Sequence, residues 1–275
     1  MGAARSKHFL LASDFDQTLS YNDSGLVLAE LLGISDYDRK VEGLAGSNLV
    51  QQGGELAYLI RHDPEFRGVR REHLVEAGRR VRLKNAIGEL VDFLETETET
   101  ADHRFSFYVI SAAPREVVVS ALDGIVTPEH IYATELDYDG DSGEVCAIRR
   151  VAAGFGKVAV IDALAAELDI TPDRIIYVGD GSSDVHVMLH VNNGDGFTIA
   201  VSGNRQLARI ARSTVLSDNA LSIVVPVLDQ VLGWRSGKIR AEIESRGLVL
   251  QDWRKARTDH VTIVDAEPVP VEEAV

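Results

Sequence analysis

The sequence predicts an α/β protein: a doubly wound parallel sheet with a helical domain inserted after the first strand. Short apolar segments alternate with helical patterns along most of the 275 residues, which is typical of a parallel sheet with helices on both faces. One long helical stretch near the N-terminus interrupts this alternation. Acidic or hydroxyl residues follow three of the apolar segments, and such sheets bind their ligands at the carboxyl ends of the strands.

The segments predicted as strands are 9–13, 105–110, 175–178, 197–201 and 214–216. Asp14, Ser111 and Asp180 stand at the carboxyl ends of the first three, so we expect them to meet at one edge of the sheet. Two further segments, 132–138 and 144–148, flank a turn rich in Asp and Gly and are predicted to form a β-hairpin.

The inserted helical domain is assigned to residues 20–84, with helices predicted at 24–33, 36–45, 47–62 and 70–83 and no clear strand. Asp23 or Ser24 is placed to cap the first of these helices. Residues 1–19 and 85–235 are assigned to the α/β core, which resumes with a helix over 85–96. Residues 236–275 are expected to form a peripheral helix and a loose acidic tail.

Composition limits the classes of partner. With 28 Lys and Arg against 43 Asp and Glu, the net charge is −15, which disfavours nucleic acids and anionic membranes. The single cysteine, Cys146 in the predicted hairpin, excludes an internal disulfide and is expected to be a core residue. No apolar run reaches the ~20 residues of a membrane span. The N-terminus leads straight into the first strand, so a cytoplasmic location is expected. The oligomeric state stays open.

Four motifs carry the chemistry of this sequence. The first is Leu10-Leu-Ala-Ser-Asp14-Phe-Asp16-Gln-Thr18, the second ends in Ser111-Ala-Ala-Pro, the third is Gly154-Phe-Gly156-Lys157, and the fourth is Ile175-Ile-Tyr-Val178-Gly179-Asp180-Gly181-Ser-Ser-Asp184. In this order and at these intervals they resemble the haloacid dehalogenase (HAD) superfamily of phosphatases, especially its phosphoserine-phosphatase-like branch. The resemblance covers residues 9 to about 225 and implies the Rossmann-like core and inserted cap of that family.

The resemblance implies roles in phosphoryl transfer. Asp14 is the expected nucleophile, forming an aspartyl-phosphate, and Asp16 the general acid that later activates water. Dehalogenases lack this second aspartate, so Asp16 favours phosphate chemistry. Ser111 and the backbone N–H of Ala112 are expected to bind phosphoryl oxygens, with Thr18 a further substrate-binding residue. The alternative to a catalytic role is that Asp14 is an ordinary turn residue at the end of a strand and that Ser111 caps the following helix.

The same motifs imply a Mg²⁺ site, because this ion prefers oxygen ligands and keeps bound waters. The carboxylates of Asp14 and Asp180 and the carbonyl of Asp16 are the expected ligands. Asp184 completes the site and is expected to orient Lys157 or a metal-bound water. Lys157 is expected to keep Asp14 ionised and to neutralise the developing charge. Elsewhere, two histidines at i, i+4 spacing, His186 and His190, are interpreted as a surface helix face because no third zinc ligand matches them.

Residues of the cap are expected to determine which substrate is bound. Residues 61–84 hold eight basic and four acidic side chains, a net +4, and Arg70, Arg79 and Arg82 are candidates for contact with an anionic substrate. The alternative is a solvated face with helical ion pairs. In phosphoserine phosphatases, a Glu seven residues after the second motif Asp helps bind the amino-acid part of the substrate. Asp23 occupies this position, and its side chain is one methylene shorter than that of Glu. The alternative interpretation is that Asp23 only caps the helix that follows it.

The sequence as a whole predicts a Mg²⁺-dependent phosphatase that acts on a small phosphorylated metabolite, with phosphoserine a poor substrate. A hydroxyl- or carboxyl-bearing phosphate ester is favoured instead. A phosphomutase that uses the same aspartyl-phosphate is one alternative. The other is a catalytically silent binding or regulatory protein, against which the intact motif residues Asp14, Asp16, Lys157 and Asp180 argue.

Overall fold

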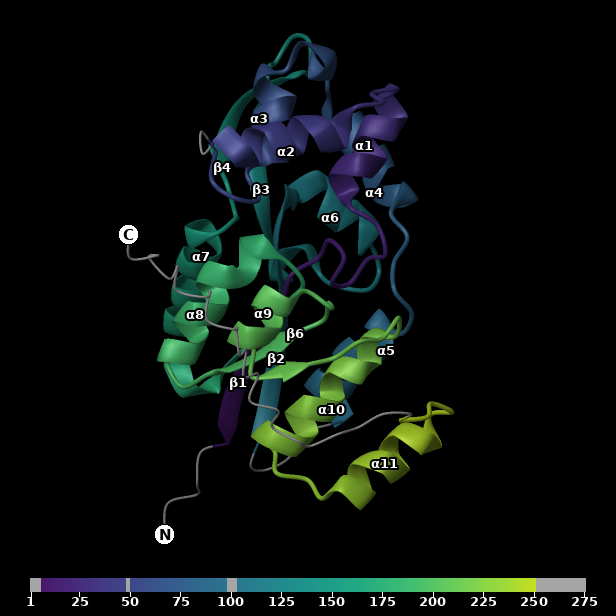
Figure 1. Ribbon diagram of the computed structural model, residues 1–275, viewed down its shortest axis with the longest axis vertical. Coiled ribbons are helices and arrows are strands. Elements are labelled where there is room, and N and C mark those ends of the chain that lie inside the picture. Colours follow the sequence, from purple (N-terminus) through teal and green to yellow (C-terminus); the bar gives the residue numbers. More distant parts are fainter. Residues whose placement is uncertain (1–5, 48–49, 98–102, 251–275) are drawn as a thin grey trace, which may run out of the picture. The chain divides into compact units, whose positions relative to one another are not determined.

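The computed structural model describes residues 6–47, 50–97 and 103–250 (Figure 1). Its seven-stranded sheet has the order β4-β3-β2-β1-β5-β6-β7, and all pairs are parallel except β3 with β4. The strands are β1 Lys7–Ser13, β2 His103–Pro114, β3 Ile131–Tyr138, β4 Val145–Arg150, β5 Ile175–Gly179, β6 Phe197–Ala200 and β7 Ser213–Thr214. The predicted mostly parallel α/β sheet with a helical insert is confirmed.

The first strand occupies the centre of the sheet. Its neighbours are β2 on one side and β5 on the other, and Ala12 pairs with Tyr108 and with Tyr177. A central parallel strand is covered on both faces and therefore reads as a continuous apolar run, which is what the sequence shows from Phe9 to Ala12. The two tyrosines consequently lie at the same level on the same face of the sheet.

That face packs against α7 (Phe155–Glu167) and α8 (Val185–Asn193), where Leu10, Tyr177 and Ile161 belong to one buried cluster. The other core helices are α5 Ile87–Asp92, the π-helical turn η2 Phe93–Glu97, α6 Arg115–Ala121, α9 Arg205–Ile210 and α10 Val224–Pro226 with the π-helical turn η7 Val227–Val231. Short 3-10 turns complete the core: η3 Pro128–His130, η4 Pro172–Arg174, η5 Ser182–Asp184 and η6 Ala220–Ile223.

The insertion between β1 and α5 is helical, as expected. Its elements are α1 Ser24–Leu32, α2 Tyr37–Ser47, α3 Glu55–His62, the 3-10 turn η1 Pro64–Phe66 and α4 Arg71–Arg80. The prediction of one helix over 47–62 was wrong at its start. Gly53 has φ 87° and Gly54 precedes the helix, so the chain turns there and α3 begins only at Glu55. Residues 48–49 lie outside the described ranges.

The cap is anchored to the core through α4 and the β3–β4 hairpin. Helix α4 packs against α6 so closely that a β-carbon on Gly78 would lie 2.3 Å from the carbonyl oxygen of Val117. Val69, at the start of this segment, accepts a backbone hydrogen bond of 2.8 Å from Val145 in β4. These contacts fix the cap on the edge of the sheet at which the strands end.

Two expectations outside the site have clear outcomes. The hairpin of β3 and β4 is confirmed, but Cys146 is exposed, so the expectation of a core cysteine was wrong. Strand β4 is the edge strand, and only a side chain on its inner face would be buried. Helix α11 (Ser236–Ser245) belongs to a second unit that begins at Trp234. The predicted tail from 251 onward is outside the described residues. None of the helices that the structure describes is long and apolar enough to span a membrane.

Candidate active site

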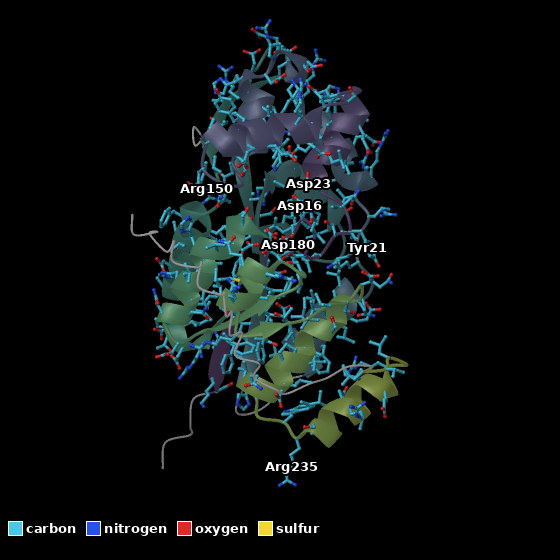
Figure 2. The ribbon with its side chains drawn as sticks, in the orientation of Figure 1. Asp16, Tyr21, Asp23, Arg150, Asp180 and Arg235 are labelled. Atoms are coloured by element: carbon cyan, nitrogen blue, oxygen red, sulfur yellow. The ribbon has the colours of Figure 1, made fainter. Side chains whose placement is uncertain are left out.

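The three sequence-predicted strand ends meet at one edge of the sheet, and Figure 2 shows Asp16 and Asp180 below the cap. Asp14 directly follows β1, Ser111 lies near the end of β2, and Asp180 directly follows β5. The backbone N–H of Asp14 donates to the carbonyl oxygen of Val178 at 2.8 Å, which extends the β1–β5 pairing to the first aspartate. The order of strands therefore places Asp14 between the other two residues.

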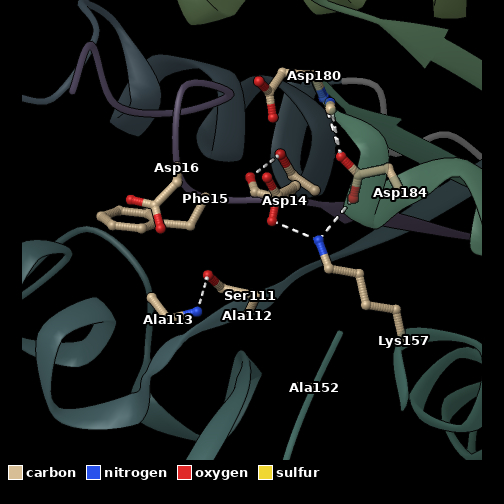
Figure 3. Close-up of polar contacts among 12 residues, drawn as sticks. Asp14, Phe15, Asp16, Ser111, Ala112, Ala113, Ala152, Lys157, Asp180 and Asp184 are labelled. Carbon is tan, nitrogen blue, oxygen red and sulfur yellow. Dashed lines mark hydrogen bonds and ion pairs between the residues drawn. The ribbon is translucent and has the colours of Figure 1, made fainter. Parts of the chain in front are cut away.

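Lys157 bridges two carboxylates in the buried centre of the site (Figure 3). Its ammonium donates to Asp14 Oδ1 at 2.6 Å and to Asp184 Oδ1 at 2.6 Å. The lysine is fully buried, and these two carboxylates raise its pKa although burial alone would lower it. Gly156 allows the first turn of α7 to close here, since a β-carbon on it would lie 2.2 Å from the carbonyl oxygen of Val151. A buried, charged lysine is thus paired with the proposed nucleophile.

Asp184 is held by four donors. Its Oδ1 accepts from Lys157 and, at 2.7 Å, from the Tyr177 hydroxyl. Its Oδ2 accepts from the backbone N–H groups of Asp180 and Gly181 at 3.1 and 3.2 Å. The carboxylate of Asp184 therefore fixes both Lys157 and the turn that carries Asp180.

The donor set fits Mg²⁺. Carboxylate oxygens of Asp14, Asp180 and Asp184 lie within 4.8 Å of one another, and a hard cation of this kind takes oxygen ligands. Burial raises the pKa of Asp14 to about 6 and the pKa of Asp180 to about 8, and neighbouring carboxylates contribute to both shifts. Crowded, buried carboxylates gain most from a divalent cation, because it neutralises the repulsion that raises their pKa values.

Asp16 faces a different environment from Asp14. Its Oδ1 accepts from the backbone N–H of Ser24 and its Oδ2 accepts from the Ser24 hydroxyl, both at 2.8 Å. No Lys or Arg of the described segments forms an ion pair with it. Burial, followed by the charges of Asp23 and Asp14, raises the pKa of Asp16 well above its ordinary range. A carboxyl group whose pKa is raised holds its proton to higher pH than an ordinary aspartate, which suits a general acid.

Ser111 and Ala112 stand near the end of β2, and Thr18 lies in the turn that follows Asp14 and Asp16. The Ser111 oxygen accepts from the backbone N–H of Ala113 at 3.1 Å (Figure 3), which leaves its own proton available to a ligand. The carbonyl of Ala112 accepts from the Thr134 hydroxyl at 2.7 Å and is thereby fixed. The Thr18 hydroxyl is buried without a hydrogen-bond partner among the described residues.

Comparison with known proteins agrees with this geometry. The family model of the haloacid dehalogenase-like hydrolases matches residues 11–189, a span that contains all four motifs. The chain belongs to this HAD-like family. A curated relative, the 2-hydroxy-3-keto-5-methylthiopentenyl-1-phosphate phosphatase of Exiguobacterium sp., is 24% identical over 182 residues, which are 63% of this chain and 77% of the relative.

Solved structures show the same fold. A substrate-bound phosphoserine phosphatase complex has a TM-score of 0.63 at 17% identity and covers 80% of this chain and 98% of its own. A phospho-aspartyl intermediate analogue of phosphoserine phosphatase has a TM-score of 0.61 at 19% identity, with the same coverage. A phosphoserine phosphohydrolase-like protein from Francisella tularensis has a TM-score of 0.60 at 18% identity, and the match covers 78% of this chain and 98% of that protein.

In this HAD-like chain the cap reaches the core motifs through the loop before α3. A β-carbon on Gly53 would lie 2.9 Å from the β-carbons of Ala153 and Ser183, in the loops of the third and fourth motifs. The Gln51 amide also donates to the carbonyl of Ala153. Gln51 and Gly53 lie in the loop where the sequence had predicted the start of a helix. This loop of the cap therefore touches the core next to Lys157.

The cap arginines expected to meet substrate lie on its exposed side. Arg70 is 3.7 Å from Glu144 and 3.9 Å from Glu72, and Arg79 is 3.9 Å from Glu76. The remaining candidate contacts a ring and not a carboxylate: Arg82 lies over Tyr21, 5.6 Å from its centroid. These positions match the ion-paired alternative more closely, and the role of the three arginines in substrate binding stays a prediction.

Asp23 caps α1 through a hydrogen bond of 2.9 Å from the backbone N–H of Leu26 to its Oδ1, as the alternative interpretation predicted. In α8, the two histidines have separate partners. His186 stacks on Phe155, and His190 lies 2.7 Å from Asp162. The two rings therefore do not form a pair of metal ligands.

Sequence reasoning missed two residues that hold the site. Ser24 was considered only as a helix cap, although its hydroxyl binds Asp16. Tyr177 was treated only as part of an apolar strand, although its hydroxyl binds Asp184. A tyrosine in an otherwise aliphatic buried strand was the available signal, because a buried hydroxyl normally has a hydrogen-bond partner.

Proposed function

We propose that this protein is a Mg²⁺-dependent phosphatase that hydrolyses a small phosphomonoester through an aspartyl-phosphate on Asp14. The observation that carries the proposal is the contrast between two neighbouring carboxyl groups. Asp14 is paired with the Lys157 ammonium at 2.6 Å, whereas the Asp16 carboxyl group accepts hydrogen bonds from Ser24 and has a strongly raised pKa. Environments that separate two carboxyl groups in this way assign one as nucleophile and the other as acid.

The proposed reaction has two steps. A carboxylate oxygen of Asp14 attacks phosphorus in line with the ester oxygen, and the P–O bond to the leaving group breaks. Asp16 gives its proton to the departing alkoxide and becomes a carboxylate. That carboxylate then takes a proton from water, the water oxygen attacks phosphorus, and the P–O bond to Asp14 breaks to release phosphate and restore both carboxyl groups.

Other residues neutralise and orient the phosphoryl group. Lys157 lies beside the attacking carboxylate, where its charge offsets that of the phosphoryl oxygens. Ser111 has a hydroxyl proton available for one of these oxygens. Asp14, Asp180 and the carbonyl of Asp16 would hold Mg²⁺, whose charge stabilises the phosphoryl oxygens when it is bound.

A phosphate-release screen over small phosphomonoesters, with and without Mg²⁺, tests this proposal. We expect release with at least one ester, loss of release with EDTA, and no release by Asp14→Asn. Products are also examined by ³¹P NMR. An isomerised phosphate ester in place of free phosphate would indicate a mutase, and the absence of any turnover across the screen would contradict an enzymatic role.

A further inference from the structure

Tyr177 carries a buried hydroxyl that the proposed mechanism does not use. It lies in β5, three residues before Asp180, and is fully buried. Its hydroxyl donates to Asp184 Oδ1 at 2.7 Å, the same oxygen that accepts from Lys157 at 2.6 Å. A buried carboxylate oxygen thus receives one donor from the proposed catalytic lysine and one from a strand residue to which the sequence analysis assigned no chemical role.

The geometry points to Tyr177 as a positioning residue that acts on Lys157 through Asp184, an inference that rests on the proposed phosphatase function. Lys157 is shared equally between Asp14 and Asp184, at 2.6 Å from each. The tyrosine hydroxyl occupies part of the acceptor capacity of Asp184, so this carboxylate holds the ammonium less strongly. Lys157 is then free to follow the negative charge as it moves from Asp14 to the phosphoryl oxygens.

The remaining contacts of Asp184 make this effect specific to Oδ1. Its Oδ2 is fixed by the backbone N–H groups of Asp180 and Gly181. A β-carbon on Gly179 would lie 2.5 Å from Asp184 Oδ2, so the carboxyl group is also pressed against the backbone. Because the carboxylate cannot rotate away, loss of the tyrosine donor changes how strongly Oδ1 holds Lys157 and does not simply move Asp184.

The chain offers a matched control. Tyr108 and Tyr177 both pair with Ala12, on its two sides, and belong to the same buried cluster. The Tyr108 ring contacts the His130 ring in a tilted arrangement, and its hydroxyl has no hydrogen bond to Asp184 or Lys157. Tyr→Phe keeps the ring in each case, including the Tyr177 ring that lies 5.9 Å from the Lys157 ammonium. Only the hydroxyl is removed.

The experiment compares Tyr177→Phe, Tyr108→Phe, Asp184→Asn and the double variant Tyr177→Phe/Asp184→Asn with the wild type. For Tyr177→Phe we expect kcat to fall by about tenfold while KM stays within about twofold, since a hydrogen bond to a charged group is lost. Tyr108→Phe should keep kcat. In the Asp184→Asn background, removing the Tyr177 hydroxyl should have no further effect, because the two residues act through one contact.

A second measurement needs no substrate. The side-chain ¹⁵N resonance of the buried Lys157 ammonium should shift in Tyr177→Phe and stay unchanged in Tyr108→Phe. An unchanged Lys157 resonance, or a full tenfold loss that persists in the Asp184→Asn background, would overturn the positioning role. A wild type without phosphatase activity would refute the proposed function instead, and the resonance would still decide whether Tyr177 acts on Lys157.

Discussion

Ser24 holds both oxygens of Asp16, one through its backbone N–H and the other through its hydroxyl, each at 2.8 Å. Ser24 is also the first residue of α1, the helix that begins the cap. The proposed general acid is therefore oriented by the cap and not by the sheet, so cap position and acid orientation are physically linked.

The first prediction concerns this contact. Ser24→Ala removes a donor that favours the charged carboxylate, so the pKa of Asp16 should rise further. Its protonated form then persists to higher pH, and the alkaline limb of the kcat/KM profile should move upward in pH. We also expect kcat to fall by about threefold to tenfold through looser orientation. Ser24→Thr retains the hydroxyl and should restore both properties; an unchanged profile in Ser24→Ala would exclude this role.

Asp14→Asn should abolish turnover without unfolding, because the amide keeps the shape of the side chain and cannot attack phosphorus. Loss of a nucleophile removes on the order of 10³ or more in rate. Phosphate release and circular dichroism check the two parts of this statement. Activity above one tenth of the wild type would exclude Asp14 as nucleophile. Beryllofluoride, an acyl-phosphate mimic, should bind the wild type only when Mg²⁺ is present.

Asp180→Ala should weaken Mg²⁺ binding and activity together, whereas Asp184→Ala should affect metal affinity less. The reason is that the Asp184 carboxylate already accepts from four protein donors, while the carboxylate of Asp180, which belongs to the same cluster, accepts no hydrogen bond from the described residues. Isothermal titration with Mg²⁺ measures both affinities. Equal losses in the two variants would show that Asp184 is itself a direct ligand.

The raised pKa values predict how stability depends on pH and metal. The ordinary value is 3.8, and burial raises the pKa of Asp14 to about 6 and that of Asp180 to about 8. Between pH 4 and 8 the folded metal-free protein then binds more protons than the unfolded chain, so its stability should fall as pH rises. Mg²⁺ replaces these protons, and it should raise Tm more at pH 8 than at pH 5.5. Equal Tm increases at both pH values would contradict the prediction.

Phosphoserine should be a poor substrate. The Asp23 carboxylate is engaged in capping α1, with 2.9 Å between Oδ1 and the backbone N–H of Leu26, so it is poorly placed to meet a substrate ammonium. Comparison of kcat/KM across hydroxyl-, carboxyl- and amine-bearing phosphate esters tests this. A tenfold or greater preference for phosphoserine that Asp23→Ala erases would show that Asp23 binds substrate as its counterpart does in phosphoserine phosphatases.

The sequence by itself determined the sheet and the members of the motif cluster. Apolar runs bounded by polar residues identify buried strands, and parallel strands place their carboxyl ends at one edge. Asp14, Ser111 and Asp180 could therefore be assigned to one site before any coordinates were known. The HAD-like family follows from the order and spacing of the same motifs.

Only the tertiary structure decided which side chains hold those motif residues and where the cap touches them. The hydroxyls of Ser24 and Tyr177, the break at Gly53, and the outward position of Arg79 depend on contacts between segments far apart in the chain. Local patterns record periodicity and turn propensity, but they do not record which distant atom lies within hydrogen-bond distance. Cys146 shows the same limit, because the burial of a side chain on an edge strand depends on which face the neighbouring elements cover.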